Sequence, residues 1–535
     1  MPELSTNTTA IVTFFLATAA VAYFTYVFVG RMKKSANATE EYFTGGRALA
    51  WPIVAGSLLL TNLSTEQLVG LNGAVYGDKA LVGVAWEALA AFAMVATALV
   101  FLPRYLASGF TTTPAFLEKR FDKTTRSMVS GLFLFGYVTV LLPVVLYTGS
   151  LAIKGIFQLE MPLWQVVVGI GVLGSAYAIF GGLKAVAVSD TLNGIGLLIG
   201  GLAIPVLGLM ALGDGSFADG ICKLGEKSEY LSVLTQENVD GKQVSVPWPT
   251  LLTGMMFIQI FYWSTNQVIV QRAMGAKSLA EGQKGVLFAS AMKLIGPLML
   301  CLPAIIALHM PELKIEENDE VYPAMVRHVL PAWSLGLFAA VLVGSILSSF
   351  NSALNSASTL FSLQFYKGYI NRDASPESIV STGKIFGATI AIASMVIAPM
   401  LASMESIFAY LQKINGLYSV PIIAIFLLGI TTRRIPALGA KLGMIVGIAS
   451  YGFFTFFPVD GFHWLHGYFV SMVAAVLVML LIGKIQPKSD EEVAVSDTRV
   501  TAPVDMTPWS GAKKASTLIV ILTVLMYALL TIAAG

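Results

Sequence analysis

Runs of about twenty apolar residues, separated by short polar segments, recur along the whole chain. A helix needs about twenty residues to cross the hydrocarbon core of a bilayer, which is roughly 30 Å thick. The sequence therefore predicts an all-α polytopic membrane protein with about 14 transmembrane helices. The 56% hydrophobic and 12% charged residues exclude a soluble protein. The candidate spans lie near 10–30, 51–76, 80–103, 127–156, 163–181, 186–212, 249–271, 285–309, 335–364, 379–401, 406–430, 438–457, 464–483 and 516–534.

The distribution of Lys and Arg predicts how these spans are oriented. Cytoplasmic loops of membrane proteins carry an excess of both residues. If the N-terminus lies outside, 24 of the 33 Lys and Arg fall on the inner side and seven on the outer side, while Lys293 and Lys413 lie within spans. We therefore expect an integral protein of the plasma (inner) membrane with both termini extracytoplasmic.

Two stretches of five spans each suggest an internal repeat. They cover 50–212 and 249–430, and because five is an odd number the second half has the opposite orientation to the first. Each half opens with a span interrupted by polar residues, TNLSTEQ at 61–67 and YWSTNQ at 262–267. Interruptions at corresponding positions of inverted halves indicate a secondary transporter whose substrate binds where the halves meet. The other parts are a flanking helix with a cytoplasmic loop, an exterior loop, two flanking helices, a cytoplasmic linker and a last helix, at 1–49, 213–248, 431–484, 485–515 and 516–535.

The first interruption, LLLTNLSTEQLVG at 58–70, places Glu66 and Gln67 at the depth of the bilayer. A carboxylate there costs a few kcal/mol or more unless it faces a cavity or a partner, so it indicates a functional site. A second acid, Glu87, is opposed by Lys293 on another span. Carboxylate, carboxamide and ammonium groups that converge on one cavity bind the hydroxyl groups of a neutral sugar. Alternatively, Glu87 and Lys293 form a structural ion pair that locks two helices together.

The segment SILSSFNSALNSAS at 345–358 carries a stripe of serines. The stripe follows i, i+3, i+4, i+7 and i+11 spacing on one helix face and consists of Ser345, Ser348, Ser349, Ser352 and Ser356. Two of these hydroxyl groups and the backbone carbonyls freed by the break near 60–63 would supply about five oxygen ligands to a hard cation. A packing face of small residues, with each serine bonded to its own helix, is the alternative.

Aromatic and amide side chains follow one another in the second interruption. Phe261, Tyr262 and Trp263 precede Asn266 and Gln267. Because sugar rings have apolar C–H faces, an aromatic plate flanked by amides is typical of a saccharide surface. An interfacial aromatic belt is the alternative interpretation.

Two further polar positions leave their role open. Asp190, near the inner end of its span, fits an ion ligand, a gate charge or a helix residue solvated at the interface. Gln412 lies beside Lys413, and a glutamine in mid-span cannot reach the interface as easily as a lysine can.

The sequence contains no motif for ATP use or covalent catalysis. The four histidines and two cysteines are scattered without metal-ligand spacing. There is no phosphate-binding glycine loop and no nucleophile elbow. We therefore expect neither an ATP-driven pump nor an enzyme.

Four motifs in a fixed order carry a family resemblance: LTNLSTEQLVG, AIFGGLKAVAVSD, YWSTNQVIVQRAMGAKS and SILSSFNSALNSAS. They resemble the sodium:solute symporters, and within that family the SGLT-type branch of bacterial sodium/galactose and animal sodium/glucose symporters. The resemblance covers nearly the whole length of the chain. It implies the LeuT-type fold, a five-plus-five inverted repeat with flanking helices that works by alternating access, and it implies Na+ as the coupling ion.

The resemblance also implies roles for individual residues. The family's sugar-contacting positions fall on Asn62, Gln67, Glu87, Tyr262, Lys293 and Gln412. The predicted substrate site adds Glu66, Gln259 and Trp263. Tyr262 resembles the inner aromatic gate, and the outer gate resembles Leu71, Trp86 and Phe408. The main sodium site would combine the carbonyl groups of Leu60, Leu63 and Ser345 with the hydroxyl groups of Ser348 and Ser349. A second sodium site would use Asp190, Ser348, Asn351 and Ser352, although Asn351 stands where a hydroxyl group is more familiar.

Three departures from the family pattern concern the sugar. Leu141 and Gln259 stand where the galactose carrier has Asn, and Ala90 replaces a Ser. The loss of one hydrogen-bond partner in a polar site changes selectivity strongly. The identity of the sugar is therefore left open.

We predict a sodium-driven symporter of a glucose- or galactose-like monosaccharide. Its partners would be the sugar, sodium ions and the lipid bilayer, with no nucleic acid and no obligatory protein partner. The alternatives are a sodium symporter of sialic acid, inositol, a carboxylate or an amino acid, and, from other classes, a sodium channel or a transporter-like sensor. An anionic solute would need an unpaired cation, which the paired acids disfavour.

Overall fold

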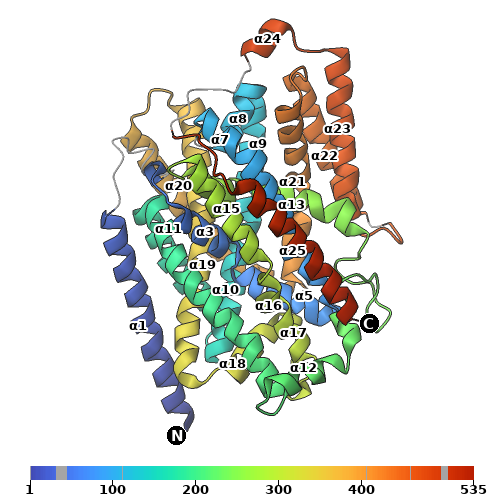
Figure 1. The fold of residues 1–535 in the computed structure, drawn as a ribbon. Helices are drawn as coiled ribbons and strands as arrows, with labels where there is room; N and C mark the ends of the chain where they lie inside the picture. Colours follow the sequence, from blue (N-terminus) through green and yellow to red (C-terminus); the bar gives the residue numbers. More distant parts are fainter. Residues whose placement is uncertain are drawn as a thin grey trace.

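The computed structural model describes residues 2–31, 45–110, 112–404, 406–457, 459–495 and 504–534. Part of the loop predicted within 1–49 and part of the linker predicted at 485–515 lie outside these residues. Figure 1 shows a bundle of helices with α8 (Thr113–Arg120) and α24 (Asp490–Val495) at one end. Helices α12 (Phe217–Gly225) and α18 (Val321–Val329) lie at the other end, toward which both chain termini are placed.

The remaining helices follow the predicted order of spans. The first half contains α3 (Trp51–Asn62), α4 (Thr65–Leu68), α5 (Gly70–Asp78), α6 (Val84–Ala96), α7 (Leu102–Ser108), α9 (Lys123–Gly136), α10 (Leu142–Phe157) and α11 (Leu163–Leu212). The second half contains α13 (Met256–Ser264), α14 (Gln267–Met274), α15 (Leu279–Lys293), α16 (Gly296–Leu300), α17 (Leu302–Ala307), α19 (Ala332–Leu360), α20 (Pro376–Ile397) and α21 (Ile407–Thr431). The flanking helices are α1 (Pro2–Arg31), α22 (Ala437–Phe456), α23 (His466–Ile485) and α25 (Ala512–Ala533).

Short 3₁₀- and π-helical segments connect these helices or extend them. The π-helical segments are η3 (Thr97–Phe101), η4 (Tyr137–Leu141), η6 (Leu251–Met255) and η9 (Phe361–Ile370). The 3₁₀ segments are η1 (Gly45–Arg47), η2 (Leu81–Gly83), η5 (Ser228–Leu231), η7 (Pro311–Leu313), η8 (Asn318–Glu320) and η10 (Ala398–Ser403).

Ten helices in the described part of the chain are long and apolar enough to cross a membrane, or eleven if the bent pair α15 and α16–α17 counts as one span. The prediction of about fourteen is not reached by this criterion for two physical reasons. The spans at 51–76 and 249–271 are broken into shorter helices. The spans at 163–181 and 186–212 both lie in α11, where Ala185–Leu212 meets the criterion and the apolar stretch Leu163–Ser175 is shorter than it requires.

Both predicted interruptions are breaks in the helical backbone. After α3 the chain leaves helical geometry at Leu63, and Ser64 is extended. After α13 it does so at Thr265 and Asn266, and the Asn266 side chain accepts a hydrogen bond from the Val268 N–H at 3.1 Å. These positions match the polar runs TNLSTEQ and YWSTNQ, so this prediction is confirmed.

Helix α19 lies at the centre of the bundle, where it contacts α1, α3, α10 and α11. Small residues bring these helices close together. A Cβ atom at Gly344 of α19 would lie 2.3 Å from the Asn193 side chain of α11, so any larger residue there would displace this side chain. The serine stripe of α19 is therefore held against the broken helix α3 and the polar part of α11.

The η8 segment covers the end of the bundle at which α12 and α18 lie. It packs against α5, where a Cβ atom at Gly73 would lie 2.7 Å from the Asp319 carboxylate and 2.9 Å from the Asn318 carbonyl oxygen. Asp319 also accepts a hydrogen bond from the Ile407 N–H at the start of α21. The segment thus joins the first half of the chain to the second half at this end.

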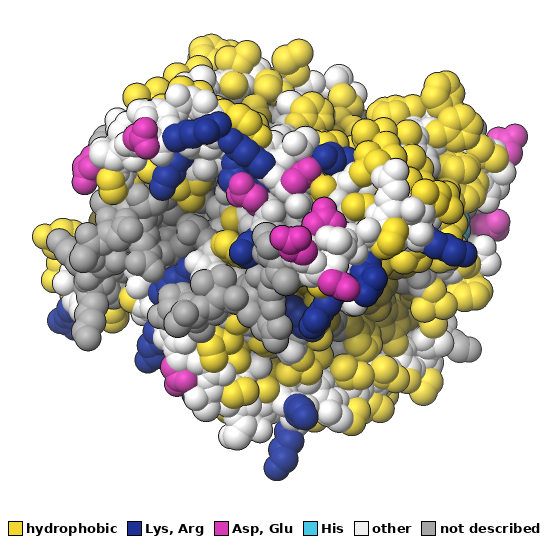
Figure 2. Space-filling model, turned by 90° about the horizontal axis from the view of Figure 1, so that it is seen from above, with side chains coloured by type: hydrophobic (Ala, Val, Ile, Leu, Met, Phe, Trp, Pro, Cys, Tyr) yellow, Lys and Arg dark blue, Asp and Glu magenta, His cyan; other side chains and the backbone are white. Residues whose placement is uncertain are grey.

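Basic side chains hold the opposite end together. Lys and Arg side chains are spread over this face in Figure 2. The buried Arg120 guanidinium donates to the carbonyl groups of Gly429, Thr432 and Ile435 at 3.0, 2.9 and 3.2 Å. Lys488 in turn donates to the Arg120 carbonyl at 2.8 Å. Arg120 therefore connects α8 to the end of α21, the start of α22 and the linker.

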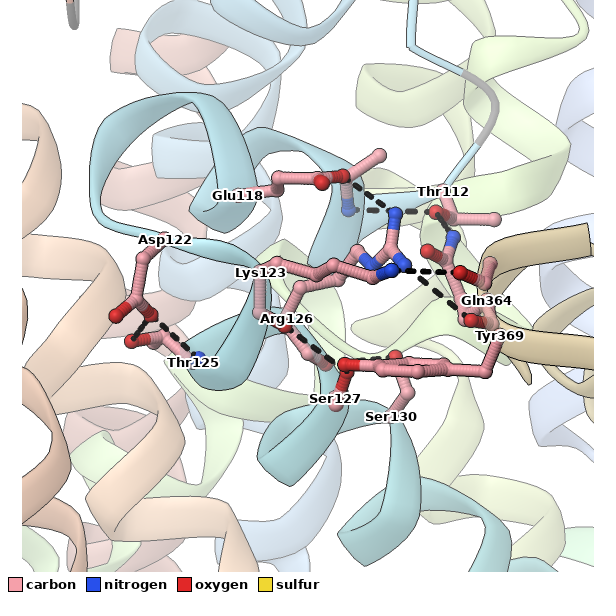
Figure 3. Close-up of polar contacts among 12 residues, drawn as sticks. Thr112, Glu118, Asp122, Lys123, Thr125, Arg126, Ser127, Ser130, Gln364 and Tyr369 are labelled. Atoms are coloured by element: carbon pink, nitrogen blue, oxygen red, sulfur yellow. Dashed lines mark hydrogen bonds and ion pairs between the residues drawn. The ribbon is translucent and has the colours of Figure 1, made fainter. Parts of the chain in front are cut away.

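A second basic cluster ties α9 to the end of the α19–η9 helix (Figure 3). Arg126 pairs with Glu118 at 2.5 Å and donates to the Gln364 carbonyl at 3.2 Å. Lys123 donates to the Gly368 carbonyl at 2.6 Å. Cations near the carbonyl end of a helix satisfy its free acceptors and interact favourably with the helix dipole.

We expect Arg120→Ala to destabilise the protein, because it leaves three carbonyl groups without their donor. A buried unsatisfied polar group costs about 1–3 kcal/mol, so the free energy of unfolding should fall by about 2 kcal/mol or more. Thermal unfolding of the purified protein in detergent measures the effect. The matched control is Arg104→Ala, which removes an exposed arginine that donates to the Val100 carbonyl one helical turn earlier. Equal melting temperatures for the two variants would contradict the proposed clamp.

Candidate substrate and sodium sites

A polar cavity of about 580 Å³ is surrounded by four parts of the chain. These are the two broken spans, helix α6 and helix α21. The lining consists of Asn62, Glu66, Gln67, Trp86, Glu87, Leu141, Ile258, Gln259, Phe261, Tyr262, Trp263, Leu411, Gln412 and Asn415. Eight of the nine predicted substrate residues are part of this lining, and the ninth, Lys293, bonds to two of them.

The Lys293 ammonium group connects both halves of the chain beside the cavity. It donates to the Glu87 carboxylate at 2.7 Å and to the Asn62 carboxamide oxygen, and it lies 5.2 Å from the Trp263 ring centre. The side chains of Lys293 and Glu87 are only 1% and 2% exposed. Gly296 makes room for the carboxylate, since a Cβ atom there would lie 2.4 Å from it. The ion pair therefore fixes one wall of the cavity.

Glu66 differs from Glu87 in having no cationic partner among the described residues. It is buried, and the Ser64 hydroxyl donates to its carboxylate. This leaves a carboxyl group in the cavity lining that makes no ion pair with a described residue. Hydroxyl groups of a bound solute are suitable donors to such a carboxylate.

Amide groups supply the other polar contacts of the lining. The Gln67 side-chain oxygen is buried and has no partner in the described part of the chain. Gln259 instead uses its amide nitrogen within the protein, donating to the Trp86 carbonyl at 2.7 Å. The Tyr262 hydroxyl bonds to Asn62. Because a buried unpaired amide is costly, Gln67 is the lining residue best suited to receive a solute hydroxyl group.

The predicted outer-gate residues lie next to the segments that η8 covers. The rings of Trp86 and Phe408 meet edge to face at 5.2 Å. Phe408 packs on Gly70 of α5, and Leu71 packs on Gly83. Phe408 also follows Ile407, whose N–H is bonded to Asp319. Trp86 belongs to the cavity lining, so the gate cluster links the cavity to the end of the bundle where η8 packs on α5.

The serine stripe meets the backbone that is freed at the first break. The Ser345 hydroxyl donates to the Leu63 carbonyl at 2.6 Å, and the Ser349 hydroxyl donates to the Thr61 carbonyl at 3.1 Å. The structure thus brings Leu63, Ser345 and Ser349 of the predicted main sodium site together at the break, with Ser345 contributing its hydroxyl group rather than the predicted carbonyl. The buried Leu60 lies three residues before Leu63, on α3. Hydroxyl and carbonyl oxygens are the ligands that hard cations prefer.

Ser348 points instead toward the predicted second sodium site. It lies beside the Asp190 carboxylate, which also accepts a hydrogen bond from Ser57 at 2.8 Å. Asp190, Ser348 and Asn351 line a cavity of about 640 Å³ between α1, α11 and α19. Neither amide atom of Asn351 has a partner among the described residues. Ser352, the fourth predicted member, lies apart from this lining and contacts Thr61 at 3.3 Å.

Asn415, Arg272 and the Thr61 carbonyl, which receives the Ser349 hydroxyl, were missed from the sequence. Asn415 lines the substrate cavity one turn beyond Gln412, and the spacing of three residues on one helix face was the available signal. Arg272 is fully buried on α14 and bonds to Thr61 and Ser352. The available signal was an arginine two residues after the apolar run VIV, but it lies just beyond the predicted end of its span, where arginine is common.

A helical bundle with two interrupted spans around a polar cavity defines the class of secondary transporters. Residues 42–447 match the Sodium:solute symporter family, and the chain belongs to this family. It is 42% identical to the uncharacterized symporter YidK of Escherichia coli, over 90% of this chain and 85% of that protein. It is 33% identical to the sodium/glucose cotransporter of Vibrio parahaemolyticus, over 81% of this chain and 83% of that protein. The human sodium/myo-inositol cotransporter 2 is 28% identical, over 80% and 68% of the two chains.

One solved structure shares the fold over 90% of this chain and 99% of its own, with a TM-score of 0.76 and 20% sequence identity. It is the substrate-bound, outward-open state of a Na+-coupled sialic acid symporter. The resemblance noted in the sequence, the LeuT-type fold and sodium as the coupling ion are thereby confirmed. The protein is a membrane-embedded sodium:solute symporter.

Replacing the partners of the Glu87–Lys293 pair one at a time should destabilise the protein strongly. Glu87→Gln or Lys293→Met leaves the other charge buried without a partner, which costs about 3–5 kcal/mol, whereas the double variant should recover much of this stability. Thermal unfolding of the three variants measures the coupling. We expect solute uptake to be lost in all three. Normal uptake by the double variant would show that the pair only locks the helices.

We expect closure by η8 to depend on pH through Asp319. Burial, together with the nearby Glu317, raises the pKa of the Asp319 carboxyl to about 6 despite the Ile407 N–H, and Tyr147 also faces it. If η8 moved away, the Asp319 carboxyl group would be hydrated and its pKa would be lower. Protonation of Asp319 therefore stabilises the closed state as the pH falls through about 6. Above this pH the negative charge of Asp319 opposes closure.

Thiol labelling of a Tyr147→Cys variant tests this expectation, with the exposed Cys222 as internal reference. The labelling rate relative to Cys222 should fall between about pH 7 and about pH 5, because closure shields position 147. Adding Asp319→Asn should remove this pH dependence. A dependence that persists with asparagine would assign the effect to another group.

Proposed function

We propose that this symporter couples sodium to the uptake of an uncharged monosaccharide by alternating access. The observation that carries the proposal is the cluster of Lys293, Glu87 and Asn62 beside the unpaired Gln67 amide in one buried cavity. The cluster offers hydrogen-bond donors and acceptors, while the opposite charges of Lys293 and Glu87 cancel each other. An uncharged polyol is the solute that uses both kinds of group without bringing a charge of its own.

The charges of the cavity disfavour an anionic solute. In the described part of the chain, the basic side chain next to the substrate cavity is Lys293, and its ammonium group already pairs with Glu87. Glu66 adds an unpaired carboxylate to the lining. A carboxylate on the solute would therefore find no unpaired cation among the described lining residues in a site of low dielectric.

Aromatic side chains supply the apolar part of the proposed sugar site. Tyr262 and Trp263 line the cavity with their rings edge to face at 5.3 Å, and Trp86 adds a third ring. Aromatic faces pack against the C–H faces of a sugar ring while the amides bind its hydroxyl groups. We propose Tyr262 as the inner gate because its hydroxyl bonds to Asn62 at the break of α3.

Coupling follows from the position of the sodium ligands on the same break. Leu63 and Thr61, whose carbonyls receive Ser345 and Ser349, flank the sugar residue Asn62. A sodium ion bound by these oxygens would fix the backbone on both sides of Asn62. Sodium and sugar would then raise each other's affinity by the same factor.

The names of two relatives also favour an uncharged solute. These names refer to glucose and to myo-inositol, which are uncharged polyols. We propose a glucose- or galactose-like monosaccharide, with a cyclic polyol such as inositol as the second candidate. We also propose that the end carrying α8 and α24 is cytoplasmic, so that both termini are extracytoplasmic, in agreement with the Lys and Arg distribution.

Uptake of radiolabelled galactose and glucose into proteoliposomes under an imposed sodium gradient tests the proposal. Uptake should require sodium, and Ser349→Ala should raise the sodium concentration for half-maximal uptake about tenfold, which corresponds to about 1.4 kcal/mol of lost ligation. The matched control is Ser394→Ala, a buried serine on α20 bonded to its own helix at Ile390.

Competition by inositol, sialic acid and amino acids completes this experiment. Competition by inositol alone would favour the second candidate. Sodium-dependent binding of only an anionic solute would overturn the sugar proposal while leaving the symporter intact. Uptake that is independent of sodium, or unchanged in Ser349→Ala, would overturn the proposed coupling site.

A further inference from the structure

The fully buried Arg272 is held between the two proposed sodium sites. Its Nε donates to the Thr61 hydroxyl at 2.8 Å, one Nη donates to the Val268 carbonyl at 2.6 Å and the other donates to the Ser352 hydroxyl. All three acceptors are uncharged. The second buried basic group of this region, Lys293, has in contrast a carboxylate directly bound to it.

The charge that balances Arg272 is the Asp190 carboxylate. The two groups interact electrostatically although their hydrogen bonds go to hydroxyl groups, Ser57 for Asp190 and Ser352 for Arg272. Buried charges are retained in membrane proteins when an opposite charge compensates them. Without the guanidinium, Asp190 would be an uncompensated carboxylate near a cavity lined mainly by apolar side chains.

The positive charge of the Arg272 guanidinium group would therefore repel a sodium ion from its immediate neighbourhood. Ser352 and Asp190 are two of the ligands proposed for the second sodium ion, and Ser352 is bonded to Arg272. Two positive charges that share these neighbours in a low dielectric repel each other strongly. Sodium can use Ser352 together with Asp190 only if the guanidinium withdraws.

We propose that Arg272 is a built-in counter-cation that alternates with sodium at Asp190 and Ser352. In the sodium-free protein the guanidinium balances Asp190. When sodium binds, the ion takes over this role and Arg272 is displaced from Ser352. The inference rests on the proposed function, because it assigns a second cation position to the same transport cycle.

The alternation gives Arg272 a positioning role between sodium and solute. Arg272 lies on α14, which continues the broken span whose first part carries Tyr262 and Trp263. Its Nε also holds Thr61, next to Asn62 at the first break. Displacement of the guanidinium group would therefore change contacts at both helix breaks that border the substrate cavity.

Binding of radioactive sodium to the purified full-length protein tests this role without any solute. In Arg272→Gln we expect sodium to bind more tightly, with a half-saturating concentration about threefold to tenfold lower, because the competing positive charge is gone. Arg272→Lys keeps the charge and should stay near the wild type. The gain should disappear when Asp190→Asn is added to Arg272→Gln.

A second variant covers the case in which Arg272→Gln does not fold. Thr61→Val removes the Nε acceptor at nearly constant volume and loosens the hold on the guanidinium, so sodium binding should tighten in the same direction. Unchanged or weaker sodium binding in the folded variants would overturn the proposal and leave Arg272 a structural residue. A gain that persists with Asp190→Asn would overturn it as well.

The outcome is separable from that of the proposed function. Failure of the sugar proposal would appear as absent sodium-dependent galactose uptake by the wild type. Failure of the counter-cation proposal would appear in sodium binding alone. Sodium binding that is detectable only after Arg272→Gln would support the proposal, and binding that is absent in both proteins would overturn it.

Discussion

Backbone groups that are freed within a bilayer must find partners inside the protein, because lipid offers none. This constraint governs the structure around the breaks after α3 and α13. Ser345 and Ser349 satisfy carbonyl groups at the first break, and the Asn266 side chain satisfies an N–H at the second. The same oxygens that solve the folding problem are suitable ligands for sodium, so the requirement for stability and the proposed function use the same atoms.

Two buried cations connect the halves of the chain at neighbouring residues. Lys293 bonds to Asn62 on the side of the substrate cavity, and Arg272 bonds to Thr61 on the side of the serine stripe. Both cations come from the second half, and both acceptors lie at the break in the first half. A change of charge on one side, by solute or by sodium, therefore acts on adjacent residues of one short segment.

The sequence predicted the site well where polar residues interrupt an apolar span. TNLSTEQ and YWSTNQ stand out because polar groups at membrane depth are costly, and both proved to be helix breaks that line the cavity. The prediction was weaker where the role depends on contacts between distant helices. Arg272 near a span end resembles an interfacial residue in sequence, but it is buried because α3 and α19 pack over it.

The sequence by itself determined the class of protein, the two broken spans and most of the residues around the cavity. These follow from local composition, since twenty apolar residues predict a span and polar residues within one predict a site. Only the tertiary structure decided which groups pair: Lys293 with Glu87 and Asn62, Ser57 with Asp190, and Arg272 with Ser352. Pairing depends on the packing of helices that are far apart in the chain, and spacing along one helix cannot specify it.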